Sequence, residues 1–161
     1  VDFAQTTRAA AGHDTLPLLP ALLGAINREM TFDTDPTRST TTAAEAFKLR
    51  RGVCQDLTQV FIAAARELGI PARYIGGHLY RADGVIAQEA GHAWAEAHVE
   101  GLGWVGFDPT NGISTGEAHV RIAMGLDYLG AAPVRGTRYG GSGETLTVAV
   151  QVEQARQQAQ N

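Results

Sequence analysis

The amino-acid sequence predicts an α+β fold in which helices pack on an antiparallel β-sheet. Apolar residues recur at helical spacing between Leu18 and Leu68, and the period changes to two from Ala72 onward. The strand-like segments that follow are separated by short turn sequences, of the kind that join antiparallel neighbours. An order of helices first and strands second is typical of this fold class.

Composition narrows the class of protein further. The chain has 161 residues, of which 44% are hydrophobic and 19% charged, as in a globular protein with a buried core. The net charge of -4 and the lack of a basic stripe speak against nucleic acid as a partner. Charged residues interrupt each apolar run before it reaches membrane-spanning length, so no membrane partner is expected. We expect a single domain over residues 1–152, forming the C-terminal part of a longer protein, and a frayed tail over 153–161.

The first predicted helix runs from Leu18 to Met30, because its apolar residues fall on one helical face. Pro17 and Pro20 lie where helix starts tolerate proline. Residues 1–16 are polar and favour no particular element.

Two further helices follow. One is predicted from Thr42 to Arg50, where Glu45 stands three residues after Thr42 in the pattern of a capping box. The next begins at or near Cys54 and ends at Gly69, a typical residue just after a helix C-terminus, with Pro71 preventing continuation.

The second half of the chain predicts strands. Residues Ala72 to Tyr80 alternate as a strand does, and His92 to Val99 and Leu102 to Asp108 form a predicted hairpin. Residues 113–143 predict long loops with one strand around 119–123, and Thr145 to Val152 alternates as a late strand.

Cys54 is the one cysteine of the chain, so a disulfide within the chain is excluded and a thiolate zinc site is not expected. A lone cysteine is either a buried structural thiol or a nucleophile. The helix start favours the reactive thiolate through the positive end of the helix dipole, and a nearby imidazole would add to this. The backbone N–H of Cys54 would also face outward as an oxyanion donor.

The predicted hairpin contains a histidine, His92, that could supply this imidazole. Symmetric pairing about Glu100 gives a three-residue loop, Val99-Glu100-Gly101, with glycine at its third position. In this register His92 lies directly opposite Asp108 on the same face, about 5 Å away. Asp108 would accept from one imidazole nitrogen and leave the other for the thiol, which is the arrangement of a catalytic triad.

Other interpretations remain open at this point. A four-residue loop would turn His92 and Asp108 to different faces. His92 would then be a strand residue bonded to backbone, and Asp108 the first residue of a turn before Pro109.

Four motifs together resemble the bacterial transglutaminase-like family of candidate cysteine peptidases: 51–56 (RGVCQD), 69–74 (GIPARY), 91–96 (GHAWAE) and 103–111 (GWVGFDPTN). The resemblance runs from Thr31 to Val152. It implies a papain-like, transglutaminase-like core with the nucleophile helix packed on an antiparallel β-sheet. It also implies a triad of Cys54, His92 and Asp108, and an upstream β-rich domain in the same polypeptide.

The expected function is cysteine-dependent acyl transfer on an amide or peptide bond of a peptide or protein, through a thioester. We expect a hydrolytic peptidase or amidase, because both tryptophans, Trp94 and Trp104, follow Cys54, whereas animal-type transglutaminases have one before the nucleophile. One alternative is a protein-glutamine transglutaminase with an amine acceptor. An alternative of another class is a non-catalytic binding or scaffold module.

Four residues are candidates for lining the cleft: Gln55, Gly91, Trp94 and Glu96. Glu96 has a structural alternative, an ion pair with Arg73. No metal and no organic cofactor are expected, because no ligand spacing demands one.

Two other features are read as incidental. The string 112–116 (GISTG) lacks the strand before and helix after it that a nucleophile elbow requires. His13 and His119 are expected on the surface. The sequence shows no signal-like or membrane segment, which favours a cytoplasmic location.

Overall fold

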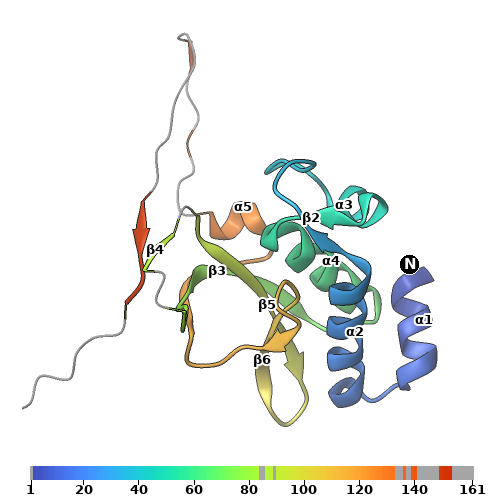
Figure 1. Cartoon of the computed structure of the whole chain (residues 1–161). Helices are drawn as coiled ribbons and strands as arrows, with labels where there is room; N and C mark the ends of the chain where they lie inside the picture. Colours follow the sequence, from blue (N-terminus) through green and yellow to red (C-terminus); the bar gives the residue numbers. More distant parts are fainter. Residues whose placement is uncertain are drawn as a thin grey trace, which may run out of the picture.

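A computed structural model of the chain describes residues 2–83, 86–88, 90–132, 136, 139–140 and 149–153. It is an α+β fold in which the N-terminal helices cover one face of a five-stranded sheet (Figure 1). The helices of the described chain are α1 (Asp2–Ala11), α2 (Thr15–Glu29), α3 (Ala43–Leu49), α4 (Cys54–Glu67) and α5 (Tyr128–Ala131). None of them is long and apolar enough to cross a membrane.

Helix α1 was not predicted. Only Ala4 of this helix is buried, so its apolar stripe is too narrow to stand out in the sequence. It is held by Phe3, whose ring lies 4.7 Å from that of Phe47. Helix α2 begins earlier than expected, capped by Asp14, and therefore Pro20 lies inside the helix and not at its start.

Helices α3 and α4 follow the prediction. Thr42 caps α3 and forms the expected capping box with Glu45. Helix α4 begins at Cys54, and Gly69 ends the turn after it in the left-handed region, with φ +80°. The nucleophile candidate therefore stands in the first turn of α4, partly buried against the same core cluster that Leu57 and Phe61 of this helix join.

The main sheet is antiparallel, with strand order β7-β6-β5-β3-β8. Its strands are β3 (Ala72–Leu79), β5 (His92–Val99), β6 (Gly103–Asp108), β7 (Ile113–Ser114) and β8 (His119–Gly125). Two small pairs stand apart from it: β1 (Thr31–Phe32) with β2 (Arg51–Gly52), and β4 (Ala87–Gln88) with β9 (Val150–Gln151).

Small side chains bring α4 close to the sheet. Strand β5 turns Ala93, Ala95 and Ala97 into the core beneath this helix, all three almost completely buried. Phe61 of α4 stacks on Phe107 of β6, with ring centroids 5.2 Å apart. The close packing of α4 on β5 and β6 thus holds the start of the helix in a fixed position relative to these strands.

The hairpin register differs from the predicted one by two residues. Val99 pairs with Gly103, and the loop is Glu100–Leu102. Continuing the register places Trp94, and not His92, opposite Asp108. His92 is a diagonal neighbour of Asp108 on the same face, because a shift of two preserves the alternation of side chains.

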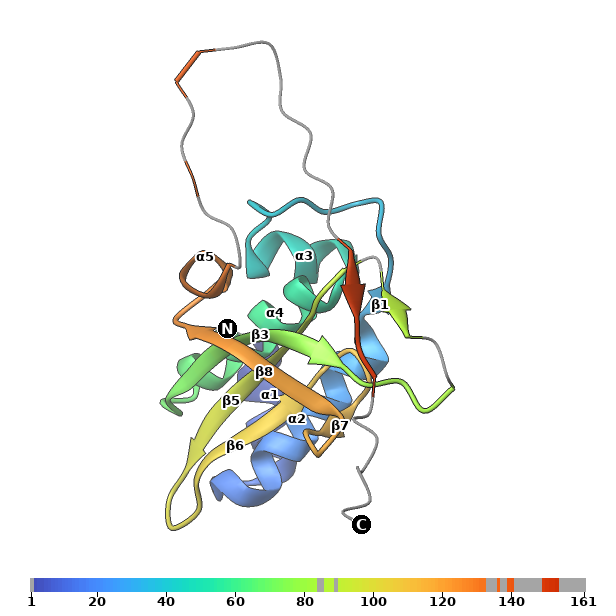
Figure 2. The same ribbon diagram turned by 90° about the vertical axis from the view of Figure 1, so that its left-hand side faces the viewer.

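The sheet is strongly curled, and β8 pairs with β3 at its edge (Figure 2). The pairing of β3 with β8 shifts register between Gly76 and Gly77. Gly77 has no room for a side chain, since an added Cβ would lie 2.7 Å from the Trp94 ring. The curl brings β8 back toward β6 across two intervening strands.

The region after Gly112 is more structured than predicted. The expected strand exists as β8 and continues to Gly125, and β7 and α5 are additional elements. Of the late strand expected over 145–152, Val150–Gln151 is a strand, whereas 145–148 lie outside the described residues. The expected tail lies outside them from residue 154 onward.

Candidate active site

Three elements meet at the candidate site: the start of α4, the start of β5 and the end of β6. Cys54 is the first helical residue and is partly exposed. The N–H groups of Asp56 and Leu57 both donate to the Val53 carbonyl, so the helix begins with Cys54. The N–H of Cys54 lies in the first turn, where no helical acceptor exists for it.

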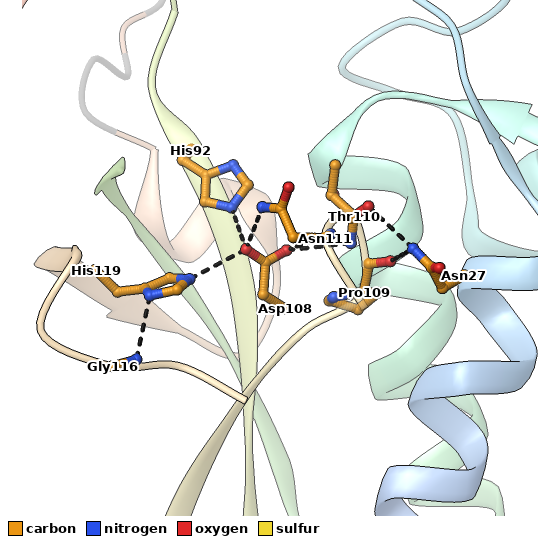
Figure 3. A network of polar contacts seen from close by, with 8 residues as sticks. All are labelled: Asn27, His92, Asp108, Pro109, Thr110, Asn111, Gly116 and His119. Carbon is orange, nitrogen blue, oxygen red and sulfur yellow. Dashed lines mark hydrogen bonds and ion pairs between the residues drawn. The ribbon is translucent and has the colours of Figure 1, made fainter. Parts of the chain in front are cut away.

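His92 joins the other two members of the predicted triad. Its Nε2 lies 2.7 Å from Oδ2 of Asp108 (Figure 3). The Cys54 side chain lies close enough to the ring to contribute to the raised pKa of His92. The structure therefore brings Cys54, His92 and Asp108 together in that order.

The charges of the site favour an ionised pair. Burial opposes the charged form of His92, but hydrogen bonds with Asp108 and Cys54 outweigh it and raise the pKa of His92 to about 9. Burial likewise opposes ionisation of Asp108, yet the hydrogen bond and charge of His92, together with hydrogen bonds from Asn111 and His119, outweigh it and lower the pKa of Asp108 to about 2. At neutral pH the site thus holds an imidazolium beside a carboxylate.

Asp108 is completely buried and firmly held. Its Oδ1 accepts the N–H groups of Thr110 at 3.1 Å and Asn111 at 3.2 Å, and Oδ2 accepts the Asn111 side-chain amide at 2.7 Å. Asn27 of α2 fixes the same turn by donating to the carbonyls of Pro109 and Thr110 (Figure 3). Asp108 therefore fills both roles considered from the sequence, since it orients His92 and also organises the turn.

His119 contradicts its expected surface position. Its side chain is 3% exposed, because the curl of the sheet carries the start of β8 onto Asp108. Its Nε2 lies 3.1 Å from Asp108 Oδ2, and its Nδ1 accepts the Gly116 N–H at 3.2 Å (Figure 3). Trp94 packs edge-on against the ring, 5.2 Å away. Nothing in the local sequence distinguishes His119, since its position depends on a contact across two strands.

Sequence reasoning also missed Asp56, which is 1% exposed. Its Oδ2 accepts the Val53 N–H at 2.9 Å and the Thr37 hydroxyl at 2.7 Å. These bonds tie the loop before α3 to the helix start that carries Cys54. Gly52 was the sequence feature that could have pointed to this contact, because a residue with a side chain would not fit there. In the structure an added Cβ would lie 2.6 Å from the Asp56 carboxylate.

Two of the expected cleft-lining residues are direct sequence neighbours of triad residues. Gln55 follows Cys54, and its amide donates to the Ser39 carbonyl at 3.4 Å. Gly91 precedes His92 and is exposed, with the Gly77 carbonyl 3.2 Å from an added Cβ.

The other two expected cleft residues are buried in the sheet. Trp94 is 2% exposed, and its ring centroid lies 6.1 Å from that of His92. Glu96 forms the ion pair with Arg73 that was the structural alternative, at 2.7 Å, and a second with Arg121 at 2.9 Å. Glu96 therefore acts as a structural ion-pair partner.

His92, Asp108 and His119 offer three potential metal ligands within 4.8 Å of one another. A ligating imidazole normally donates its second N–H to an acceptor. The second nitrogen of His119 instead receives an N–H from Gly116. The donor set therefore suits a hydrogen-bond network better than a metal ion.

A thiol at a helix start, packed against a sheet that supplies histidine and aspartate, defines the papain-like class of cysteine proteins. Within this class the chain belongs to the transglutaminase-like superfamily, whose core model matches residues 2–109.

The chain also resembles curated proteins of unassigned function. An uncharacterized protein of Mycobacterium leprae, ML0607, is 37% identical over 63% of this chain and 37% of its own length. One of Mycobacterium tuberculosis, Rv2569c, is 31% identical over 84% of this chain and 46% of its own. The chain thus spans less than half the length of these relatives.

Two solved structures share the fold. A candidate cysteine protease of Cytophaga hutchinsonii matches with a TM-score of 0.69 and 28% identity, over 81% of this chain and 44% of its own. The periplasmic domain of TgpA from Pseudomonas aeruginosa matches with a TM-score of 0.53 and 27% identity, over 68% of this chain and 42% of its own. These matches agree with the fold class expected from the sequence.

Proposed function

We propose that this protein is a cysteine-dependent acyl-transfer enzyme that cleaves an amide or peptide bond of a peptide or protein through a thioester. The observation that carries this proposal is the position of His92, which hydrogen-bonds Asp108 and lies close enough to the Cys54 side chain for that group to help raise its pKa. The superfamily match and the candidate cysteine protease among the solved relatives support it.

The first half-reaction forms the thioester. The Cys54 thiolate attacks the substrate carbonyl carbon, and the carbonyl oxygen becomes an oxyanion near the Cys54 N–H. The C–N bond then breaks, and the leaving amine takes a proton from the His92 imidazolium. Asp108 keeps the imidazole in the orientation and tautomer that this transfer needs.

The second half-reaction releases the acyl group. Neutral His92 removes a proton from water, the oxygen attacks the thioester carbon, and the C–S bond breaks to give a carboxylic acid. The Cys54 thiolate and the His92 imidazolium are thereby restored.

Water is the proposed acceptor in place of an amine. Both tryptophans follow Cys54 in the chain, and Trp94 is buried beside the His92 ring. An amine acceptor must compete with water through specific contacts that position it. Such contacts would come from acidic groups, and Glu96 is already paired with Arg73 and Arg121.

The acceptor is tested with a glutamine-containing protein and a labelled primary amine, measuring ammonia release and label incorporation together. Ammonia release without incorporation is expected. Dominant incorporation at millimolar amine would instead make the protein a transglutaminase, and C54A is the matched control.

Thiol reactivity tests for a non-catalytic scaffold. The chain has one cysteine, so alkylation by iodoacetamide reports on Cys54 alone. We expect alkylation at pH 6 to be many times faster than that of free cysteine. A rate equal to that of free cysteine would favour the scaffold.

The cellular compartment of the protein is a further part of this proposal. We keep the cytoplasm as the expected location, although the TgpA match is a periplasmic domain. Fractionation of cells that express the whole protein would decide between the two.

A further inference from the structure

His119 is a buried second histidine on the triad carboxylate. Its side chain is 3% exposed and both ring nitrogens have partners, Asp108 Oδ2 at 3.1 Å and the Gly116 N–H at 3.2 Å. The proposed mechanism gives it no step. A buried, fully satisfied imidazole in contact with a catalytic carboxylate therefore calls for a role of its own.

The partners of His119 fix its protonation state. The Gly116 N–H donates to Nδ1, so Nδ1 must offer a lone pair and cannot carry a proton. The proton of the neutral ring is then on Nε2, which donates to Asp108. Trp94 packs edge-on against the ring and fixes its plane, at an interplanar angle of 79°.

We propose that His119 is a positioning residue, a neutral imidazole that donates to Asp108 and limits how strongly this carboxylate holds the proton of His92. The inference rests on the proposed function, because it concerns the acid–base pair of that reaction.

The effect follows from three donors sharing one oxygen. Oδ2 of Asp108 accepts from His92 at 2.7 Å, from Asn111 at 2.7 Å and from His119 at 3.1 Å. Each neutral donor stabilises the carboxylate and so weakens its pull on the His92 imidazolium. An imidazolium that is held less tightly gives its proton to a leaving amine more readily, since the best general acid has a pKa near the working pH.

The groups around His119 indicate that its side chain acts on Asp108. Within the part of the chain that the structure describes, the ring contacts two titratable groups, Asp108 from β6 and His92 from β5, whose ring centroid lies 6.1 Å away. Arg121, two residues along β8, is engaged by Glu96. A substitution of His119 therefore acts on the His92–Asp108 pair.

The test compares H119F with H119Q in the full 161-residue chain. Phenylalanine keeps an aromatic ring against Trp94 and removes the donor, whereas the glutamine amide keeps a donor near the position of Nε2. One measurement is the pH dependence of Cys54 alkylation by iodoacetamide. The other is an NMR titration of the ¹⁵N-labelled histidine side chains. H13F, at an exposed histidine remote in sequence, is the matched control.

In H119F the ion pair should persist over a wider pH range. The His92 titration, which sets the alkaline limit of the ion pair, should move up by roughly half a pH unit, the size expected for loss of one neutral hydrogen bond. The acid limb of alkylation should stay in place, because His92 is protonated on both sides of it. H119Q should restore the wild-type values, and H13F should not change them. In the wild type, ¹⁵N shifts should show His119 protonated at Nε2 alone.

Three outcomes would overturn the inference: a proton on Nδ1 of His119, a narrower or unchanged pH range in H119F, or equal effects of H119F and H119Q. The proposed function fails separately, if wild-type Cys54 reacts no faster than free cysteine while the NMR results stand.

Discussion

The two sides of the candidate site are built in different ways. On the nucleophile side, the contacts that fix Cys54 come from nearby in the chain, through Val53, Asp56 and Thr37. On the acid–base side, Asp108 is held by residues as distant as His92, His119 and, through the turn carbonyls, Asn27. The first side is a local helix start, whereas the second exists only in the assembled fold. Substitutions on the two sides should therefore fail in different ways.

The largest effect is expected from C54A. Alanine suits the first turn of a helix and removes only the sulfur, so the stability of the fold should stay close to that of wild type. Turnover should fall to background, as measured with the amide substrate used in the acceptor assay. Substantial remaining activity with an intact far-UV spectrum would place the nucleophile elsewhere.

D108N disrupts the acid–base side of the site, although the asparagine side chain has nearly the same shape as that of aspartate. The amide can select the wrong tautomer of His92, and a loss of about 10³- to 10⁴-fold in turnover is expected. The Asn111 amide and backbone donors also lose a charged acceptor, so the melting temperature should drop as well. Turnover and thermal unfolding measured on the same sample separate the two effects, and wild-type turnover at all pH values would make Asp108 structural only.

The pH dependence of stability should also report the acid–base side. The pKa of His92 is raised to about 9 from its ordinary value of 6.5, so its pairing stabilises the fold fully below pH 6.5. This contribution, on the order of 3 kcal/mol, is lost as the pH rises through 9. Urea unfolding between pH 6 and 10 measures it. H92F should flatten this part of the profile, and an equally steep decline in H92F would assign the effect to another group.

The smallest effect is expected on the nucleophile side from G52A. The new Cβ would lie 2.6 Å from Asp56 Oδ2 and displace this carboxylate from Val53 and Thr37. A cost of about 1–3 kcal/mol in unfolding free energy is expected, with slower alkylation of Cys54. G136A is the control, because nothing lies within 4 Å of its Cβ. Equal stability of the two variants would show that the helix start adapts to the methyl group.

The same contrast explains what the sequence could predict. The start of α4 at Cys54, the capping box at Thr42 and the ends of β5 follow from local patterns, and the structure has them as expected. The hairpin loop was placed one residue too early, which shifts every cross-strand partner by two, because both Gly101 and Gly103 adopt the left-handed backbone that a turn glycine provides, with φ +81° and +83°. The face shared by His92 and Asp108 was still right, since side chains alternate with a period of two.

Contacts between distant strands were beyond sequence reasoning. The position of His119 depends on the register shift at Gly76 and Gly77 and on the curl of the sheet, which no local period encodes. Helix α1 was missed for a different reason, because it buries one small residue and its apolar positions are mostly alanines.

The bond from Asn27 to the Pro109 carbonyl has a consequence for folding kinetics. It closes a separation of 82 residues, so it forms only after helix α2 has met the end of β6. Closing such a loop carries a high entropic cost, and contacts of this kind slow folding. The turn that orients Asp108 is then among the last parts of the molecule to become rigid. His92 and Asp108, the residues that would activate the thiol of Cys54, follow it in the sequence by 38 and 54 residues, so they are synthesised after it.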